Sequence, residues 1–229
     1  MDIKLVIFDM DGTILDTLED LTDSTNYALK KNGLKERSID EVRSFVGNGI
    51  RKLIERAVGN VREDNNIDGS VDDNIGDDVI DKVFEDFKEY YAKNCAIKTK
   101  PYDGIIEIVK ELKEKGIYTA VVSNKADFAV QSLCVDYFDN IFDYAVGEKE
   151  GIKCKPCPDG VMDVLNRFGI EKENAVYVGD SDVDFMTAKN SGLEFIGVTY
   201  GFRTREFLEN LGSRNLADSP REILKFILN

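Results

Sequence analysis

Two aspartates near the start of the chain, Asp9 and Asp11, directly follow the apolar run Leu5–Phe8 and precede a turn made by Gly12 and Thr13. A strand end that only caps the next helix would need one acid and not two. Residues two apart in an extended chain point to the same side, and glycine lets a ligand approach the backbone closely. The stretch is therefore a candidate site for carboxylate chemistry.

Polar residues also follow two later apolar runs, Tyr118–Val122 and Ala175–Val178. They are Ser123, Asn124 and Lys125 after the first run, and Asp180, Ser181 and Asp184 after the second. Ligands of a parallel sheet bind beyond the carboxyl ends of its strands. We therefore expect these side chains to converge with Asp9 and Asp11, joined by Lys155 from the loop sequence "KCKPCP".

The acids of this candidate site suit a hard cation. Asp9, Asp11 and Asp180 would repel one another without one, and oxygen ligands are those that Mg²⁺ prefers. The chain contains no histidine, which excludes Ser-His-Asp hydrolysis, phosphohistidine chemistry and histidine-based metal sites. Carboxylates, a lysine and a metal must carry the chemistry of any enzyme built on this sequence.

The elements that would position these residues alternate between apolar, β-branched runs and helical patterns. Strands are expected at Lys4–Phe8, Tyr118–Val122, Asn140–Val146, Ala175–Val178 and Phe195–Val198, and helices at 105–112, 126–137, 160–168, 185–191 and 219–227. Such alternation predicts an α/β fold with a parallel sheet covered by helices on both faces.

One long segment, residues 16–97, contains no convincing strand. Its apolar residues recur at helical spacing in three places, 18–31, 50–58 and 79–91. The stretch 60–78 is rich in Gly, Asn and Asp with few apolar residues, so it is expected to be a surface loop or a frayed helix. Its acids do not have the spacing of a calcium loop. The sequence predicts a core domain made of residues 1–15 and 98–229, interrupted by a helical domain of residues 16–97.

Composition limits the partners of the protein. The chain has 229 residues and a formal net charge of −14, so its surface repels nucleic acid and anionic lipid. We see neither a bilayer-spanning apolar run nor a secretion signal, and we expect a cytoplasmic protein without nucleic-acid or membrane partners. The pair Cys154 and Cys157 lacks a second pair or a histidine, and is expected to be two ordinary loop thiols.

Four motifs give the chain a family resemblance. In order, "DMDGTILDT", "SNK", "KPCP" and "GDSDVD" resemble those of the haloacid dehalogenase-like superfamily of phosphotransferases. The resemblance covers nearly the whole chain and implies a Rossmann-like core with an inserted α-helical cap domain. Two further stretches, "VGNGIRKLIERAVG" and "GVTYGF", resemble the phosphoglycolate phosphatase branch of that superfamily.

The resemblance also implies roles for the candidate residues. Asp9 would attack phosphorus and form an aspartyl-phosphate, and Asp11 would protonate the leaving alkoxide and later accept a proton from water. Asp9, the backbone carbonyl of Asp11, and Asp180 would hold Mg²⁺. Ser123 and Lys155 would hold the phosphoryl oxygens with Asn124 and the amides of Gly12 and Thr13 beside them, while Ser181 and Asp184 would support the ligands, Asp184 by orienting Lys155 or a metal-bound water. Relatives that cleave carbon–halogen bonds lack the second acid, so Asp11 favours phosphate chemistry.

Residues of the helical insert are candidates for substrate specificity. Asn48 and Gly49 precede a helix that begins near Ile50, and the amides at a helix N-terminus can bind a carboxylate. Arg51 could pair with an anionic end of the substrate. The alternatives are a plain helix start and a surface charge.

The resulting hypothesis is a Mg²⁺-dependent phosphatase, monomeric or homodimeric, that hydrolyses a small phosphorylated metabolite such as 2-phosphoglycolate. Within the same superfamily, a sugar-phosphate mutase, a nucleotidase or a pyrophosphatase remains open. A non-catalytic binding protein on this fold is the third alternative. Such a protein is expected to have lost a motif acid, whereas Asp9, Asp11, Lys155 and Asp180 are all present.

Overall fold

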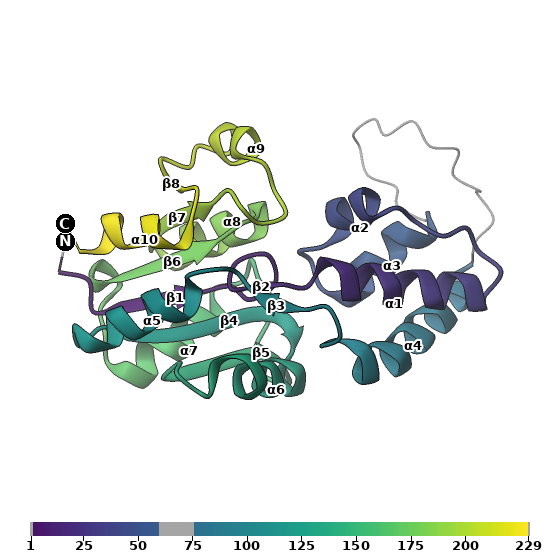
Figure 1. Ribbon diagram of the computed structural model, residues 1–229, viewed down its shortest axis with the longest axis horizontal. Helices are drawn as coiled ribbons and strands as arrows, with labels where there is room; N and C mark the ends of the chain where they lie inside the picture. Colours follow the sequence, from purple (N-terminus) through teal and green to yellow (C-terminus); the bar gives the residue numbers. More distant parts are fainter. Residues whose placement is uncertain (1, 60–75, 229) are drawn as a thin grey trace. The chain divides into compact units, whose positions relative to one another are not determined.

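The computed structural model describes residues 2–59 and 76–228. The chain divides into two compact units, Met1–Asp16 with Lys100–Asn229, and Thr17–Thr99. The first unit is an α/β domain, and the second, inserted after its first strand, is made of helices (Figure 1).

The α/β unit is built on one six-stranded sheet with the order β5-β4-β1-β6-β7-β8, in which every pair of neighbouring strands is parallel. Its strands are β1 (Leu5–Phe8), β4 (Tyr118–Ala126), β5 (Tyr144–Glu148), β6 (Ala175–Gly179), β7 (Glu194–Val198) and β8 (Asn215–Ala217). Two short antiparallel strands, β2 (Leu15–Asp16) and β3 (Lys100–Pro101), pair where the chain leaves and re-enters this unit.

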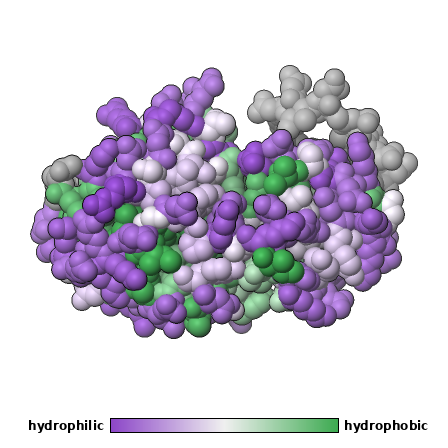
Figure 2. Space-filling model, viewed as in Figure 1, coloured by the Kyte–Doolittle hydropathy of each residue, from purple (hydrophilic) through white to green (hydrophobic). Residues whose placement is uncertain are grey.

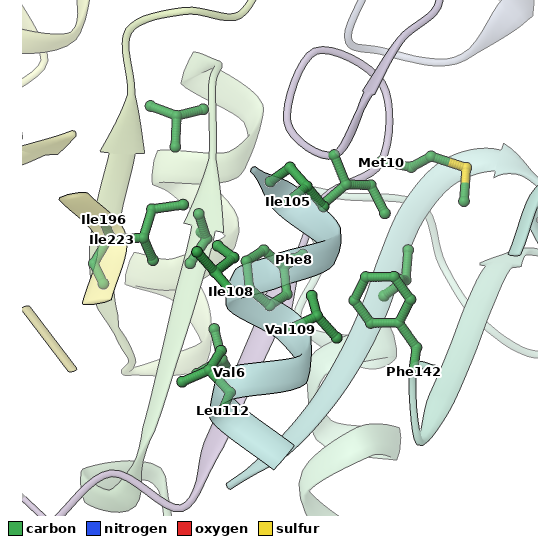
Figure 3. Packing of buried hydrophobic residues seen from close by; sticks show 14 of the residues in the cluster. Val6, Phe8, Met10, Ile105, Ile108, Val109, Leu112, Phe142, Ile196 and Ile223 are labelled. Carbon is green, nitrogen blue, oxygen red and sulfur yellow. The ribbon is translucent and has the colours of Figure 1, made fainter. Parts of the chain in front are cut away.

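Helices cover both faces of the sheet. They are α5 (Ile105–Glu114), α6 (Asp127–Phe138), α7 (Asp159–Phe168), α8 (Asp182–Ser191), α9 (Arg205–Asn210) and α10 (Pro220–Ile227), with the 3₁₀ turn η1 (Lys172–Asn174). Apolar residues of α5, α6 and α10 pack with one set of strand residues, and those of α7 and α8 pack with the other. Figure 3 shows the first core, where Phe8 of β1 lies beside Ile108 and Val109 of α5.

The strands are buried on both sides because their residues alternate between the two cores. Val6 and Phe8 belong to the core beneath α5, whereas Leu5 and Ile7 belong to the opposite one. This explains the continuous apolar runs in the sequence, which are typical of central parallel strands. The predicted fold class, a parallel α/β core with helices on both faces and an inserted helical domain, is confirmed.

The helical unit contains α1 (Leu18–Lys31), α2 (Ile39–Phe45), α3 (Ile50–Val58) and α4 (Asp77–Asn94). Its two ends are tied together by Asp20 of α1, whose buried carboxylate accepts hydrogen bonds from the backbone N–H groups of Lys98 and Thr99 at 2.8–3.1 Å. Most of the expected surface loop, residues 60–75, lies outside the described residues.

The surface agrees with the charged composition. The face of each unit seen in Figure 2 is mostly hydrophilic, with scattered apolar side chains. Within residues 2–59 and 76–228, no helix combines the length and the apolar character needed to cross a membrane. Cys154 is an exposed free thiol and Cys157 a half-buried one.

Candidate active site

The candidate site lies at the carboxyl ends of the central strands β1, β4 and β6. Phe8 is paired with Val121 on one side and Val178 on the other, so the residues that follow these three positions emerge at the same edge of the sheet. Asp9 follows Phe8 directly, and its N–H donates to the carbonyl of Val178 at 2.9 Å. The sheet thus brings together segments that are more than a hundred residues apart in the sequence.

Lys155 lies between two of the acids. Its Nζ is 2.6 Å from Asp9 Oδ1 and 2.8 Å from Asp184 Oδ1, and its side chain is 4% exposed. Burial alone would lower the pKa of Lys155, but Asp184 and Asp9 outweigh that effect and hold the pKa well above its ordinary value. Lys155 is therefore a fixed positive charge directed at Asp9.

Asp184 is held by several of its neighbours. Its second oxygen accepts from the backbone N–H of Ser181 at 3.1 Å and from the Ser181 hydroxyl at 2.5 Å, in a capping box at the start of α8. Tyr177 donates to its first oxygen at 3.4 Å. This geometry suits a residue that orients Lys155, as the sequence predicts for Asp184.

Asp180 is held from two sides. Its carboxylate accepts from the Thr13 hydroxyl at 3.3 Å and from the backbone N–H of Phe202 at 2.6 Å. Glycines make room for it, because a Cβ at Gly12 or at Gly201 would collide with this side chain. Gly12 also has a φ of 84°, a conformation that favours glycine. The close approach of two backbone segments therefore places Asp180 beside the first motif.

The donors of this site fit a divalent cation. One oxygen each from Asp9, Asp180 and Asp184 lie within 4.8 Å of one another, and all three residues are buried. With three carboxylates and one ammonium, Lys155, the cluster carries a charge of −2 when all groups are ionised (−3 + 1). A hard cation with oxygen ligands would balance that charge.

Burial of the acids strengthens the case that this site binds a cation. Desolvation, reinforced by Asp184 and only partly offset by Lys155, raises the pKa of Asp9 from its ordinary 3.8 to about 7. Desolvation together with Asp184 and Asp9 raises the pKa of Asp180 well above its ordinary value. Ionising these buried carboxylates is costly, and a bound cation would remove that cost.

Asp11 pairs with a different lysine from the one in this cluster. Both of its oxygens accept from Nζ of Lys125, at 2.9 and 3.1 Å, and its side chain is 17% exposed. The two acids of the first motif therefore face two different lysines, Asp9 facing Lys155 and Asp11 facing Lys125.

The predicted phosphate-binding residues lie at the same edge of the sheet. Ser123 and Asn124 are buried at the end of β4. The amide of Asn124 is engaged with the backbone of Lys155, donating to its carbonyl at 3.0 Å and accepting from its N–H at 2.7 Å, so Asn124 helps to place that lysine. The N–H groups of Gly12 and Thr13 donate within their own turn, to the carbonyls of Leu15 and Met10. Phosphate contacts from these groups stay predictions.

The predicted specificity residues belong to the helical unit. Asn48 and Gly49 are half-buried and precede α3, which begins at Ile50 as expected. Arg51 is already paired within its own unit, with Asp81 at 2.5 Å and Glu55 at 3.3 Å. An anionic substrate would have to compete with these carboxylates for the guanidinium group.

Two contributors, Tyr177 and Phe202, were not among the predicted site residues, and a third, Lys125, was given no role there. Lys125 is placed two residues after Ser123, and alternate residues of a strand share a side, which is a signal that the sequence contains. Tyr177 contacts Asp184, and the N–H of Phe202 binds Asp180. The Phe202 contact has no sequence signal because it is made by the backbone.

Comparison with known proteins identifies the family of this chain. A family model described as haloacid dehalogenase-like hydrolase matches residues 6–198. Phosphoglycolate phosphatase 1 of Pseudomonas aeruginosa is 31% identical over 222 residues, which are 96% of this chain and 78% of that protein. Phosphoglycolate phosphatase of Haemophilus influenzae is 32% identical over 200 residues, which are 87% of each chain.

A solved structure agrees over both units. The crystal structure of a Lactobacillus delbrueckii subsp. bulgaricus protein, provisionally assigned as a phosphoglycolate phosphatase, is 37% identical with a TM-score of 0.92, and the match covers 99% of each chain. The family match includes the strand ends that hold Asp9, Ser123 and Asp180. The chain therefore belongs to the haloacid dehalogenase-like hydrolase family.

Proposed function

We propose that this protein hydrolyses 2-phosphoglycolate, or a phosphomonoester of similar size, through an aspartyl-phosphate at Asp9 with the help of Mg²⁺. The coarser assignment does not depend on the substrate: the chain is a phosphomonoester hydrolase. The observation that carries the finer proposal is the cluster of buried acids, Asp9, Asp180 and Asp184, around Lys155.

In the first half of the reaction, a carboxylate oxygen of Asp9 attacks phosphorus and the bond to the leaving oxygen breaks. Asp11 donates its proton to that oxygen, so the product leaves as an alcohol and Asp11 becomes a carboxylate. Lys155 and Ser123 hold the phosphoryl oxygens during the transfer. Because Lys155 is buried between two acids, it is aimed without further rearrangement.

In the second half, water attacks the phosphorus of the aspartyl-phosphate. Asp11 now accepts a proton from this water, which regenerates the acid, and the Asp9 carboxylate is released together with inorganic phosphate. Asp9, the backbone carbonyl of Asp11, and Asp180 would hold Mg²⁺. The cation would neutralise the charge on the phosphoryl oxygens and on the attacking carboxylate.

A substrate panel tests the proposed function. Purified protein with Mg²⁺ should release inorganic phosphate from 2-phosphoglycolate with a higher kcat/KM than from sugar phosphates, nucleoside monophosphates or pyrophosphate. The reason is that relatives 31% and 32% identical to this chain are named phosphoglycolate phosphatases. Each alternative predicts a different preferred compound: a nucleoside monophosphate, pyrophosphate, or a sugar phosphate that is isomerised without phosphate release. A preference for any of these would replace the 2-phosphoglycolate assignment.

Specificity for the carboxylate end of 2-phosphoglycolate is proposed to come from the turn at Asn48 and Gly49 and from Arg51. Asn48→Ala and Arg51→Ala should each lower kcat/KM for 2-phosphoglycolate about ten- to a hundredfold, the usual value of one charge-assisted contact. The same variants should affect p-nitrophenyl phosphate, which has no carboxylate, much less.

The ion pair of Arg51 offers a matched control. Asp81→Asn removes a competitor for the guanidinium group, so it should lower KM for 2-phosphoglycolate if Arg51 binds the substrate. Equal losses on both substrates would assign the turn to folding of the helical unit. Unchanged activity on both substrates would mean that the turn is only the start of a helix.

A further inference from the structure

The second acid of the first motif has a buried lysine of its own, Lys125, just as the nucleophile has Lys155. The side chain of Lys125 is 3% exposed, and its ammonium donates to both oxygens of Asp11. A lysine buried to this extent requires a charged partner, because an uncompensated ammonium in the interior is costly. The pair is thus a built feature of the site and differs from the exposed ion pairs elsewhere in the described chain.

The two partners differ in how firmly their backbones are held. Lys125 belongs to β4, its N–H donates to the Ser123 hydroxyl at 3.2 Å, and its carbonyl lies against Gly147, where a Cβ would collide with it. Asp11 lies in the irregular turn after β1 and is joined to Leu15 by a single bridge. Lys125, whose backbone is held in a strand, is therefore placed to orient the carboxylate of Asp11, which lies in a turn.

We propose that Lys125 is the positioning residue for Asp11, holding its carboxylate where it delivers a proton to the leaving oxygen. This inference rests on the proposed function, in which Asp11 is the general acid and base. In this cycle Asp11 gives its proton to the alkoxide, remains beside the Lys125 ammonium as a carboxylate, and regains a proton from water. Each acid of the first motif then has its own lysine: Lys155 pairs with Asp9, and Lys125 pairs with Asp11.

The leaving group distinguishes this role from a direct contact with phosphate. An alkoxide is a strong base and needs a proton as it departs, whereas p-nitrophenolate leaves readily without one. A positioning residue of the general acid matters for alkyl phosphates and much less for p-nitrophenyl phosphate. A residue that binds the transferred phosphoryl group matters equally for both, because both substrates carry that group.

The experiment measures kcat/KM for 2-phosphoglycolate and for p-nitrophenyl phosphate in wild type, Lys125→Met and Asp11→Asn. This quantity reports the steps up to transfer of the phosphoryl group, in which Asp11 acts as an acid. We expect Lys125→Met to lower kcat/KM for 2-phosphoglycolate about 30-fold, which is a part of what general acid catalysis contributes. The loss of kcat/KM for p-nitrophenyl phosphate should be at least about tenfold smaller. Asp11→Asn should show the same pattern with larger losses.

A double variant tests whether Lys125 acts through Asp11. If it does, Asp11→Asn combined with Lys125→Met should be no slower than Asp11→Asn alone, within about twofold. Lys125→Gln, which keeps a hydrogen-bond donor, should show the same selective loss to a smaller extent. Cooperative thermal unfolding of each variant shows that it is folded, and the exposed Lys115→Met serves as the matched control.

Equal losses on the two substrates, or independent losses in the double variant, would overturn the inference and assign Lys125 to phosphate binding or to folding. Failure of the proposed function has a different signature. In that case wild type itself would release no phosphate from 2-phosphoglycolate, or would prefer another compound of the substrate panel.

Discussion

Replacing Asp9 by asparagine should abolish turnover. The amide has no anionic oxygen with which to attack phosphorus, so kcat for any phosphomonoester should fall at least about a thousandfold. Asp9→Glu should also be nearly inactive, because the extra methylene displaces the carboxylate from the position that Lys155 holds. Phosphate release in a continuous assay measures both.

The fold should survive this substitution. Burial raises the pKa of Asp9 to about 7, so its ionised form is not a source of stability, and asparagine has nearly the same shape. Thermal unfolding of Asp9→Asn should therefore be cooperative, with a midpoint close to that of wild type. Asp2→Asn, at an exposed position, is the control for changes of charge alone. Activity of Asp9→Asn within tenfold of wild type would exclude covalent catalysis at this residue.

Removing divalent metal should have the next largest effect. EDTA should lower activity at least about a hundredfold, and Mg²⁺ should restore it, because a divalent cation would balance the charge of −2 (−3 + 1) that the cluster carries when ionised. Asp180→Asn should raise the Mg²⁺ concentration needed for half-maximal activity at least about tenfold. Titration of activity with Mg²⁺ measures both effects.

Asp182→Asn is the matched control, since Asp182 lies two residues further on with a side chain that is 42% exposed. It should titrate like wild type. Full turnover in metal-free buffer would contradict the metal assignment, and an equal shift in both variants would trace the effect to net charge.

Stability gives a readout of the metal that does not require activity. Because the pKa of Asp9 is raised from 3.8 to about 7, the folded protein binds more protons than the unfolded one between these values. In EDTA, the contribution of Asp9 to the free energy of unfolding therefore falls as the pH rises through this range. Mg²⁺ binds the ionised carboxylates, so it should raise the unfolding midpoint more at about pH 8 than at about pH 5.

The sequence predicted the parts of the fold that depend on local pattern. Central strands such as β1 and β6 are buried on both faces, and their uninterrupted apolar runs are visible in one chain. The strand expected at Asn140–Val146 is instead β5, Tyr144–Glu148, because the chain turns at Asp139 and Asn140, both of which have positive φ. Asp and Asn adopt a positive φ more readily than other non-glycine residues, so this turn did have a signal in the sequence.

Short elements were missed for different reasons. β8 has three residues and exists because it pairs with β7, a contact that no local pattern contains. The helix α2 was predictable, since Ser38 and Glu41 form a capping box immediately before and within it. Local signals therefore suffice where an element is stabilised by its own residues, and fail where a distant partner stabilises it.

The candidate site could likewise be predicted only as far as local sequence signals extend. The acids and Lys155 could be proposed from sequence because each follows a strand or lies in a distinctive motif. Their pairing could not, because it depends on which side chain reaches which: Asp184 is engaged with Lys155 and Ser181, and Asp11 with Lys125. These contacts join residues up to 114 positions apart, and only packing of the sheet determines them.

Trapping the covalent intermediate tests the central claim most directly. In Asp11→Asn, the base that activates water is missing, whereas p-nitrophenolate leaves without an acid, so the aspartyl-phosphate should accumulate. The variant is mixed with p-nitrophenyl phosphate and Mg²⁺, quenched in acid, and analysed by intact-protein and peptide mass spectrometry. The account predicts a burst of p-nitrophenol matched by one phosphoryl group on the peptide that contains Asp9. A burst matched instead by free phosphate, with the protein unmodified, would contradict it.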